Sequence, residues 1–493
     1  MKDRKNIIVI GGGFSGLSTA AFLAKKDMNV TLIEKNKNLG GRARRIQEKG
    51  YSFDMGPSWY WMPEIFNNFF NHFNYKVDDL YELIKLDPGF KMIFKDHEIP
   101  ISADWDKICL TFESYEKNGR KKLEAFMQDA KKKYNIGMEF IYQSPGISFL
   151  ELLTKNIIKN FRKFQILTSY KKHVRNYFNH PYLIHILEFP ILFLGSSSDN
   201  TPALYSLMAY SGIKEGTFYP MGGFHQVIKS MQKICEEQGV QILTETEIDH
   251  INIKKHKAHS VSVDKKNIKC DILICSADYQ HIEQKLLDKE YRNYSKRYWQ
   301  ERTFAPSALI FYIGVKERVN KLEHHNLFFD EDISQHIDEI YKYKEWPSKP
   351  LFYLSCTSKT DPNVAPKDHE NIFILIPIAN GIEDTPETRE KYYNIVISRL
   401  EKYCNQKIKE KIDYKKSYCI KDFIKDYNAY KGNAYGLANT LSQTANLKPK
   451  IYNKKVSNLF YTGQLTVPGP GVPPSIISGQ IVSEFIIKKS EEL

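Results

Sequence analysis

The alternation of apolar and polar residues near the start of the chain predicts a strand, a turn, a helix and a second strand. The run "KNIIVI" (5–10) is short and apolar, which is typical of a buried strand. After three glycines, "FSGLSTAAFLAKK" (14–26) has the length of a helix and ends in lysines, which suit a helix C-terminus. "NVTLIE" (29–34) has the pattern of a second strand. We therefore expect a βαβ unit here.

The end of the chain shows a different pattern, because no charged or histidine residue occurs between Val456 and Ser483. Length alone would allow a transmembrane span. Prolines and glycines crowd positions 468–474, however, and lipid cannot satisfy the backbone groups that they leave free. We expect instead a strand at 458–463, a loop at 464–474 and a helix at 475–489.

The glycines of the first turn form the pattern G-x-G-x-x-G at Gly11, Gly13 and Gly16, directly after a strand. The first glycine makes the tight turn, the second lets a pyrophosphate approach the backbone, and the third lets the helix pack on the sheet. Glu34 follows 18 residues after Gly16, where a carboxylate can accept hydrogen bonds from ribose hydroxyls and would repel a 2′-phosphate. This unit predicts a dinucleotide site, for either NAD or FAD.

A second glycine turn, Gly40-Gly41-Arg42, follows the second strand and places a cation beside it, and "GYSFDMGPSWYW" then contains the turn Gly56-Pro57. Here the sequence resembles the flavoprotein superfamily that carries a doubled-glycine motif after the dinucleotide fold. That superfamily includes amine oxidases, protoporphyrinogen oxidases and carotenoid desaturases. The resemblance implies noncovalently bound FAD.

Three further segments resemble one branch, the bacterial-type phytoene desaturases of carotenoid biosynthesis. They are "GTFYPMGGFHQVIKSM" (216–231), "NAYGLANTLSQTANLKP" (433–449) and "NLFYTGQLTVPGPGVPPSIISG" (458–479). The resemblance spans essentially the whole chain and implies FAD-dependent desaturation of phytoene towards lycopene by hydride transfer in an apolar tunnel. Gln464 and Leu465 depart from it, because small residues are commoner there. Alternatives are another carotenoid desaturase, a ketolase, an isomerase or an amine oxidase of the same fold, or a non-catalytic lipid or prenyl carrier.

By this resemblance the last strand and helix close the flavin site. Gly463 and Gln464 then lie near the ribityl chain and diphosphate, Gly471 and Val472 face the pyrimidine edge of the flavin, and the Ile248 backbone meets the adenine. The candidate cofactor-binding residues are Gly11, Gly13, Phe14, Ser15, Gly16, Glu34, Lys35, Gly41, Arg42, Gly56, Ile248, Gly463, Gln464, Gly471 and Val472.

The implied fold is α/β, with a three-layer Rossmann-type FAD-binding domain and an inserted mixed α+β domain that faces substrate and membrane. We expect the FAD-binding domain to use residues 1–75, 215–300 and 425–493, and the inserted domain to use 76–214 and 301–424. No second G-x-G-x-x-G has the strand and helix context of a nucleotide site. This argues against a separate NAD(P)H site and for a quinone or oxygen as electron acceptor.

Charge and cysteine content add expectations about location. The net charge of +13 favours anionic partners, and 151–175 carries seven Lys and Arg opposite an apolar arc, as an interfacial helix on anionic lipid does. An ordinary surface helix is the alternative, and the apolar 182–195 segment suits either a tunnel wall or a membrane dip.

No nucleic-acid motif is present. The seven scattered cysteines favour a reducing cytoplasm. We expect peripheral association with the inner face of the cell membrane.

The catalytic residues are not indicated by any motif, since a hydrocarbon offers no acid, amine or carbonyl to bind. The aromatic segment "SWYWMP" (58–63) is a candidate for stabilising positive charge that develops on the substrate, and packing in the core is the alternative. His324 and His325 lack further partners at metal-ligand spacing, so we expect no metal.

Overall fold

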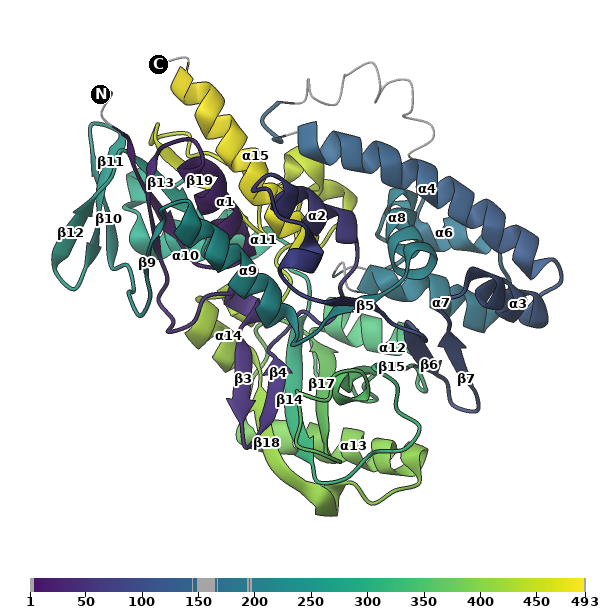
Figure 1. The fold of residues 1–493 in the computed structure, drawn as a ribbon. Coiled ribbons are helices and arrows are strands. Elements are labelled where there is room, and N and C mark those ends of the chain that lie inside the picture. The colour runs from purple at the N-terminus through teal and green to yellow at the C-terminus, as the bar shows by residue number, and fades with distance from the viewer. Residues whose placement is uncertain are drawn as a thin grey trace.

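A parallel sheet forms the nucleotide-binding half of the protein (Figure 1). The structure is a computed structural model that describes residues 4–143, 145–148, 165, 167–192, 195 and 197–491. Within these residues, five parallel strands are ordered β19-β13-β1-β2-β9. They are β1 (Asn6–Ile10), β2 (Asn29–Ile33), β9 (Gln241–Leu243), β13 (Ile272–Cys275) and β19 (Leu459–Tyr461). The first and last strands predicted from the sequence therefore lie in one sheet.

Alternate residues of β1 face two different layers, which explains its continuous apolar run. Ile7 and Val9 pack with helices on one face, whereas Ile8 and Ile10 pack with a cluster that includes the small antiparallel sheet on the other. The helices are α1 (Phe14–Ala24), α9 (Phe224–Glu237) and α15 (Val472–Glu491), and the small sheet is β10 (His250–Lys254), β11 (Lys257–Val263) and β12 (Lys266–Lys269). The predicted three-layer α/β fold is confirmed.

A second sheet lies below the first in Figure 1 and, in the described chain, has seven strands in the order β18-β14-β17-β16-β15-β6-β7. Neighbours are antiparallel except for β15 and β6. The strands are β6 (Phe90–Ile93), β7 (Glu98–Ile101), β14 (Ser307–Val315), β15 (His325–Phe328), β16 (Phe352–Ser355), β17 (Glu370–Ile378) and β18 (Ile412–Tyr418). One face of β14 packs in the cluster with α13 (Pro386–Cys404), and Ala308 and Ile310 face the other way.

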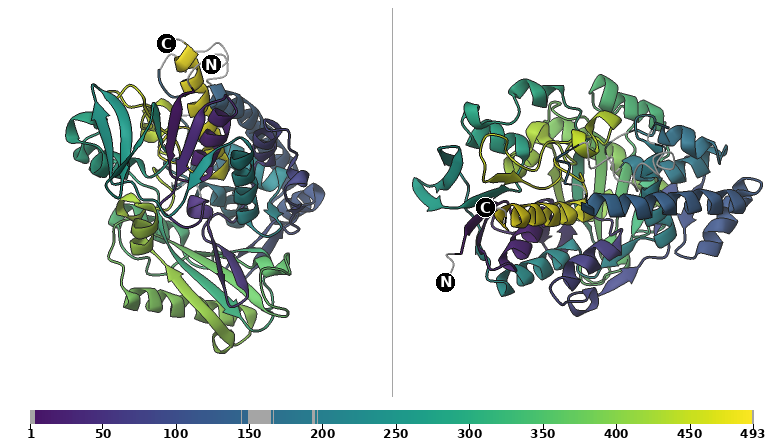
Figure 2. Two further views of the ribbon diagram at one scale, coloured as in Figure 1. Left: turned by 60° about the vertical axis from the view of Figure 1, so that its left-hand side comes forward. Right: turned by 90° about the horizontal axis from the view of Figure 1, so that it is seen from above.

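A group of helices lies beside the seven-stranded sheet, and Figure 2 shows them from two more sides. They are α3 (Trp105–Tyr115), α4 (Gly119–Gln143), α6 (Tyr170–Arg175), α7 (Pro181–Leu192) and α8 (Leu207–Ala209). The remaining α-helices of six or more residues among those described are α2 (Pro63–Asn71), α11 (Lys296–Glu301), α12 (Ile333–Asp338) and α14 (Ile420–Tyr427). The short strands β3 (Arg45–Glu48) and β4 (Tyr51–Asp54) form a hairpin, and β5 (Leu83–Lys85) pairs with β8 (Phe218–Pro220).

The five strands of the parallel sheet all fall in segments 1–75, 215–300 and 425–493, and those of the seven-stranded sheet fall in 76–214 and 301–424. The division into two domains stays a prediction. The helix predicted at 475–489 begins three residues earlier, at Val472, with Pro473 and Pro474 in its first turn. Proline is tolerated there because the first amides of a helix have no partner within the helix.

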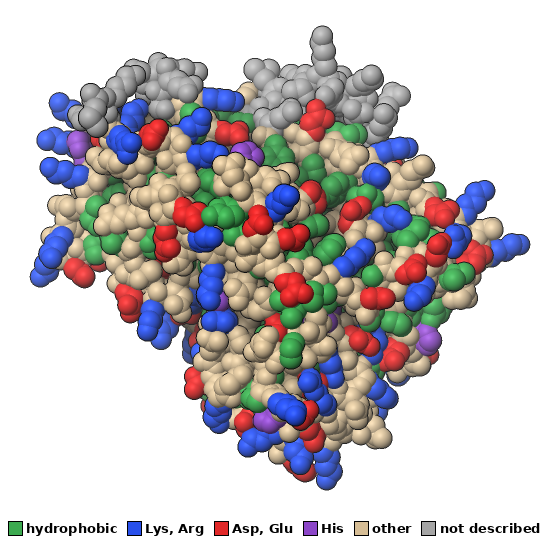
Figure 3. All heavy atoms as spheres, in the orientation of Figure 1, with side chains coloured by type: hydrophobic (Ala, Val, Ile, Leu, Met, Phe, Trp, Pro, Cys, Tyr) green, Lys and Arg blue, Asp and Glu red, His purple; other side chains and the backbone are tan. Residues whose placement is uncertain are grey.

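The two segments considered for membrane contact have different outcomes. Most of 151–175, including Lys155, Lys159, Arg162 and Lys163, lies outside the described residues. The apolar 182–195 segment falls largely in α7, where Leu183, Ile186 and Leu187 are fully buried against the protein core. No helix in the described ranges combines the length and the apolar character that crossing a bilayer requires. On the face shown in Figure 3, basic side chains are spread around the outline and interspersed with acidic ones.

Candidate active site

One cavity of about 370 Å³ is lined by residues from both large sheets. Its volume is in the range typical of small-molecule sites. The carboxyl ends of β1 and β2 form one end of it, and Ala308, Tyr353 and Leu375 of the seven-stranded sheet contribute to the other. We call these the dinucleotide end and the aromatic end. Parallel sheets bind ligands at the carboxyl ends of their strands, and the first end has that position.

The glycine turn after β1 has the geometry that its spacing predicts. Gly11 has φ +105°, a conformation that other residues rarely adopt, and its N–H donates to the Ile33 carbonyl at 2.8 Å. A Cβ on Gly16 would lie 1.9 Å from the Gly11 carbonyl oxygen, so only glycine lets α1 pack here. A Cβ on Gly13 would have nothing closer than Gly41 Cα at 3.9 Å. The turn therefore has no room for a side chain at Gly16, whereas at Gly13 there is free space towards the cavity.

Glu34 lies directly after β2 with only 6% of its surface exposed. Its two carboxylate oxygens accept hydrogen bonds from the backbone amides of Gly12 and Asn36, both at 2.8 Å. These contacts fix the carboxylate at the cavity wall. Each carboxylate oxygen has more than one acceptor site, so Glu34 can still receive hydroxyl donors from the cavity side.

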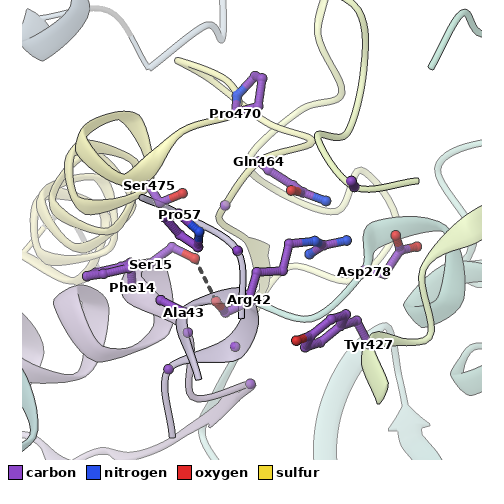
Figure 4. A pocket seen from close by; sticks show the side chains of 18 of the residues that line it. Phe14, Ser15, Arg42, Ala43, Pro57, Asp278, Tyr427, Gln464, Pro470 and Ser475 are labelled. Carbon is purple, nitrogen blue, oxygen red and sulfur yellow. Dashed lines mark hydrogen bonds between the residues drawn. The ribbon is translucent and has the colours of Figure 1, made fainter. Parts of the chain in front are cut away.

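Arg42 projects from the second glycine turn into the cavity, towards Gln464 and Asp278 and beside the ring of Tyr427 (Figure 4). One guanidinium nitrogen donates to the Asn433 carbonyl at 3.1 Å, and the Tyr427 ring centre is 5.1 Å from the guanidinium carbon. With its amide turned so that the oxygen faces the guanidinium, Gln464 accepts from Arg42 at 3.1 Å. Burial lowers the Arg42 pKa, although Tyr427 and Asp278 counter it, and Nε is buried with no partner in the described chain. A buried cation with an open donor suits an anionic ligand.

The C-terminal segment closes the same cavity from the other side. Gly463 has φ +109°, and its N–H donates to Ser478 Oγ in α15 at 3.0 Å, which holds the end of β19 against the helix. Gly471 and Val472, at the start of α15, line the cavity. The positive end of the dipole of this long helix therefore lies at the cavity wall.

The aromatic end is lined by apolar and aromatic side chains. Trp59 lies with its ring centre 5.3 Å from that of Trp61 and 5.5 Å from that of Tyr353. The other lining residues here are Met55, Ser58, Met62, Met208, Ala308, Ile310, Leu375, Ala434 and Tyr435. Their side chains carry no charge at neutral pH, so this end provides a low-dielectric chamber.

His324 and His325 are both buried behind this chamber. The His325 ring stacks on Trp59 with centres 4.2 Å apart, and its Nδ1 is 2.7 Å from the Tyr353 hydroxyl. Burial lowers the pKa of His324 to about 3, and burial together with His324 holds the pKa of His325 well below its usual value, so both imidazoles are neutral. Among the described residues, no group of three or more His, Cys, Asp or Glu could hold a metal ion.

Comparisons with known proteins agree with this geometry. The sequence pattern of the family described as flavin containing amine oxidoreductase matches residues 14–487. The chain belongs to this family. It is 38% identical over 490 residues to a carotenoid 3,4-desaturase of Haloarcula japonica, covering 98% of both chains. It is 25% identical to a zeta-carotene-forming phytoene desaturase of Myxococcus xanthus, covering 98% of this chain and 94% of the other.

A solved structure shows the same fold. An oxidoreductase from Methanosarcina mazei aligns with a TM-score of 0.64 at 16% identity, covering 97% of this chain and 100% of the other. The resemblance to carotenoid desaturases of the flavoprotein superfamily is confirmed by these comparisons, as are FAD and oxidoreductase activity. The open donor of Arg42 and the room beside Gly13 fit the diphosphate of this cofactor.

Of the fifteen residues predicted to bind the cofactor, fourteen line the cavity. Gly16 does not, because it packs α1 against the turn. That these residues bind FAD stays a prediction.

The contribution of α14 to the cavity was not predicted from the sequence. Asp426, Tyr427 and Asn428, at the end of α14 and just after it, line the dinucleotide end. Their segment "IKDFIKDY" has an ordinary amphipathic pattern, and only its long-range packing places it here. The pairing of Arg44 with Asp426 at 2.6 Å connects α14 to the second glycine turn.

Proposed function

We propose that this flavoprotein desaturates a carotenoid polyene. The observation that carries the proposal is a single cavity that joins a glycine-turn cradle to an uncharged aromatic chamber. A polyene hydrocarbon has no polar group to be recognised, so shape and apolar contact must select it, at about 25 cal/mol per Å² of buried apolar surface. The names of the two curated relatives support this substrate class.

For the cofactor, we propose that the turn from Gly11 to Gly16 and Arg42 hold the diphosphate of FAD. Glu34 would bind the ribose, and the backbone of Ile248 would meet the adenine. Gly463 and Gln464 would contact the ribityl chain, and the start of α15 at Gly471 and Val472 would face the flavin ring. When bound there, FAD supplies hydride acceptance.

The residues of the aromatic end would position the polyene and exclude water. Holding reacting atoms in a fixed geometry can contribute about 7–11 kcal/mol towards lowering a barrier. The faces of Trp59 and Trp61 would stabilise positive charge as it develops on the carbon that loses hydride, by about 0.5–2 kcal/mol per ring. At the other side, the positive end of α15 would stabilise negative charge near the cofactor.

Phytoene, converted towards lycopene, is the first candidate substrate, because three sequence segments resemble phytoene desaturases. The second candidate is a polyene that undergoes 3,4-desaturation, which the name of the relative at 38% identity favours.

Expression in two host strains, one that accumulates phytoene and one that accumulates lycopene, would test both candidates. Loss of phytoene and growth of longer chromophores supports the first candidate, and conversion only in the lycopene strain supports the second. Products that gain oxygen indicate a ketolase, and products of unchanged mass indicate an isomerase. No new product in either strain, with no FAD on the purified protein, would indicate a carrier and contradict the proposal.

We also propose peripheral association with the inner face of the cell membrane, because the substrate resides in lipid, and a quinone or oxygen as electron acceptor. Flotation with anionic and neutral vesicles tests the first proposal, with stronger binding to anionic vesicles expected from the net charge of +13. Reoxidation of the reduced protein by a soluble quinone or by air tests the second.

A further inference from the structure

A second, much smaller cavity adjoins the aromatic end. Its volume is about 20 Å³, and Asp54, Ser58 and Ser355 are among the residues that line it. A cavity needs roughly 10–15 Å³ and polar partners to hold one water molecule, so this one has room for a single water. Ser58 lines both cavities and therefore lies between them.

Two polar atoms at the small cavity lack a well-aligned partner. Asp54 Oδ1 and Ser355 Oγ are fully buried and make no hydrogen bond of good geometry within the described part of the chain, although the Ser355 hydroxyl lies beside that of Tyr353. The other Asp54 oxygen, Oδ2, accepts from the Phe224 amide at the start of α9 at 2.9 Å. A buried polar atom without a partner costs about 1–3 kcal/mol, and a water molecule in the cavity would satisfy both.

Tyr353 extends this polar group to the aromatic end. It lines the large cavity, and the hydroxyls of Ser355 and Ser58 lie close enough to lower the pKa of its phenol, which burial otherwise raises. The Tyr353 hydroxyl is also 2.7 Å from His325 Nδ1. The Tyr353 hydroxyl at the chamber wall thus has two polar neighbourhoods behind it. One is His325, and the other leads through the serine hydroxyls and the small cavity to Asp54.

The two routes differ in how well they can accept a proton. Burial and the neighbouring His324 hold the pKa of His325 well below its usual range, so protonated His325 is strongly disfavoured. Burial, together with the negative charge of Asp361, raises the pKa of Asp54 to about 7 against the lowering effects of the Phe224 and His225 amides and Arg45. A base works best when its pKa is near the working pH, and Asp54 meets that condition.

We propose that Asp54 is the terminal proton acceptor of the desaturation, reached from the aromatic end through Tyr353, Ser58 and one water in the small cavity. The inference rests on the proposed function. In each desaturation one carbon loses hydride with its electron pair to the oxidised flavin. The adjacent carbon loses a proton, and the electron pair of its C–H bond forms the new double bond. The relay carries that proton to Asp54, which later releases it to solvent.

The test uses the FAD-loaded protein with Asp54→Asn, whose amide oxygen can still accept from the Phe224 amide. Flavin reduction by the substrate is followed anaerobically in a single turnover across pH. Because the relay needs ionised Asp54, the parent rate should rise with pH through about 7. The variant should lose this rise and react at least about a hundredfold more slowly.

Asp361→Asn is the matched control, because this buried carboxyl accepts from the Gly222 amide at 2.7 Å and is not part of the cavity wall. Removing its negative charge should lower the Asp54 pKa and move the rise of the rate to lower pH. Ser355→Ala provides a second variant if Asp54→Asn does not fold, and it should slow the reaction without moving the rise.

An infrared titration gives a readout independent of turnover. Burial raises the pKa of Glu283 to about 7 as well, so the parent should lose the bands of two protonated carboxyls as pH rises through about 7 and Asp54→Asn should lose only one. If the parent turns over but Asp54→Asn keeps its rate and pH profile, the proposal is wrong. If the parent converts no carotenoid, the proposed function fails instead, and the titration still reports whether Asp54 binds a proton near neutral pH.

Discussion

The two ends of the main cavity are lined by chemically different side chains. The dinucleotide end has charged side chains fixed by hydrogen bonds, with Glu34 bound by two amides and Arg42 by the Asn433 carbonyl. The aromatic end has indole, phenol, methionine and aliphatic side chains and, among its described lining residues, no carboxylate or basic group. The first end can recognise a charged group of fixed shape, whereas the second can accept a chain without polar atoms.

This difference separates binding of the cofactor from selection of the substrate. Hydrogen bonds to charged groups are directional and contribute about 1.5–3 kcal/mol each, so the dinucleotide end holds one ligand in one place. Apolar contact is not directional and scales with area, so the aromatic end selects by volume and shape. A substitution at one end should therefore change one property and leave the other unaltered.

The largest expected effect is the loss of FAD from Gly13→Val. The space beside Gly13 is open in the protein, so the side chain should fit but occupy the position of the diphosphate. We expect FAD binding to weaken by about a hundredfold, which corresponds to the upper end of the 1–3 kcal/mol that overpacking typically costs, since each 1.4 kcal/mol is tenfold. Flavin absorbance per protein measures how much FAD is retained, and circular dichroism measures whether the variant is folded.

Gly16→Val is the contrasting variant for this prediction. Its Cβ would meet the Gly11 carbonyl oxygen at 1.9 Å, so this variant should lose the fold as well as FAD. A folded Gly13→Val protein with full flavin occupancy would contradict the cradle assignment.

Ala434→Trp tests the other end. Ala434 lines the cavity, and an indole there would fill part of the chamber. Turnover should fall by about a hundredfold, the scale expected when a substrate is misplaced by about 1 Å, while FAD occupancy stays at the parent level. Ala434→Ser should behave like the parent. Equal loss of FAD and turnover in Ala434→Trp would mean that the two ends are not separate in function.

The same contrast governs what could be predicted from the sequence. The dinucleotide end depends on residues 11–16 and 40–42, because a tight turn and a close approach to phosphate need glycines at fixed local spacing. The aromatic end takes Met208, Tyr353 and Leu375 singly from distant segments, and one residue in a strand or helix gives no periodic signal. Trp59, Trp61 and Met62 were indicated, because they fall in the candidate segment 58–63 directly after the Gly56-Pro57 turn.

Arg42→Gln tests the charge at the dinucleotide end. It removes the buried cation with the open donor, so FAD binding should weaken by about tenfold to a hundredfold, following the 1.5–3 kcal/mol of charged hydrogen bonds. Arg44→Gln is the control, because Arg44 does not line the cavity itself and pairs with Asp426 of α14. Equal weakening in both variants would show that the loss comes from the packing of α14 and not from contact with the cofactor.

The smallest expected effect is that of Lys35→Gln, and it distinguishes a ligand contact from a contact that only holds the wall. Lys35 lines the cavity, but its ammonium donates to the Lys425 carbonyl at 2.7 Å and to Asn428 Oδ1 at 3.3 Å, and lies 3.5 Å from Glu247. The contacts with Lys425 and Asn428 hold the Lys35 side chain against the end of α14. The side chain is 21% exposed, so solvent screens the ion pair, which should contribute about 0.2–1 kcal/mol.

FAD binding by Lys35→Gln should therefore weaken by no more than about fivefold, and added salt should reduce the difference from the parent. Lys37→Gln, at an exposed position nearby, should match the parent. Titration of FAD into the apoprotein of each variant at two ionic strengths measures the FAD affinity and its dependence on salt. A loss as large as that of Arg42→Gln would place Lys35 among the groups that contact the cofactor directly, and the dinucleotide end would then hold its ligand with two cations.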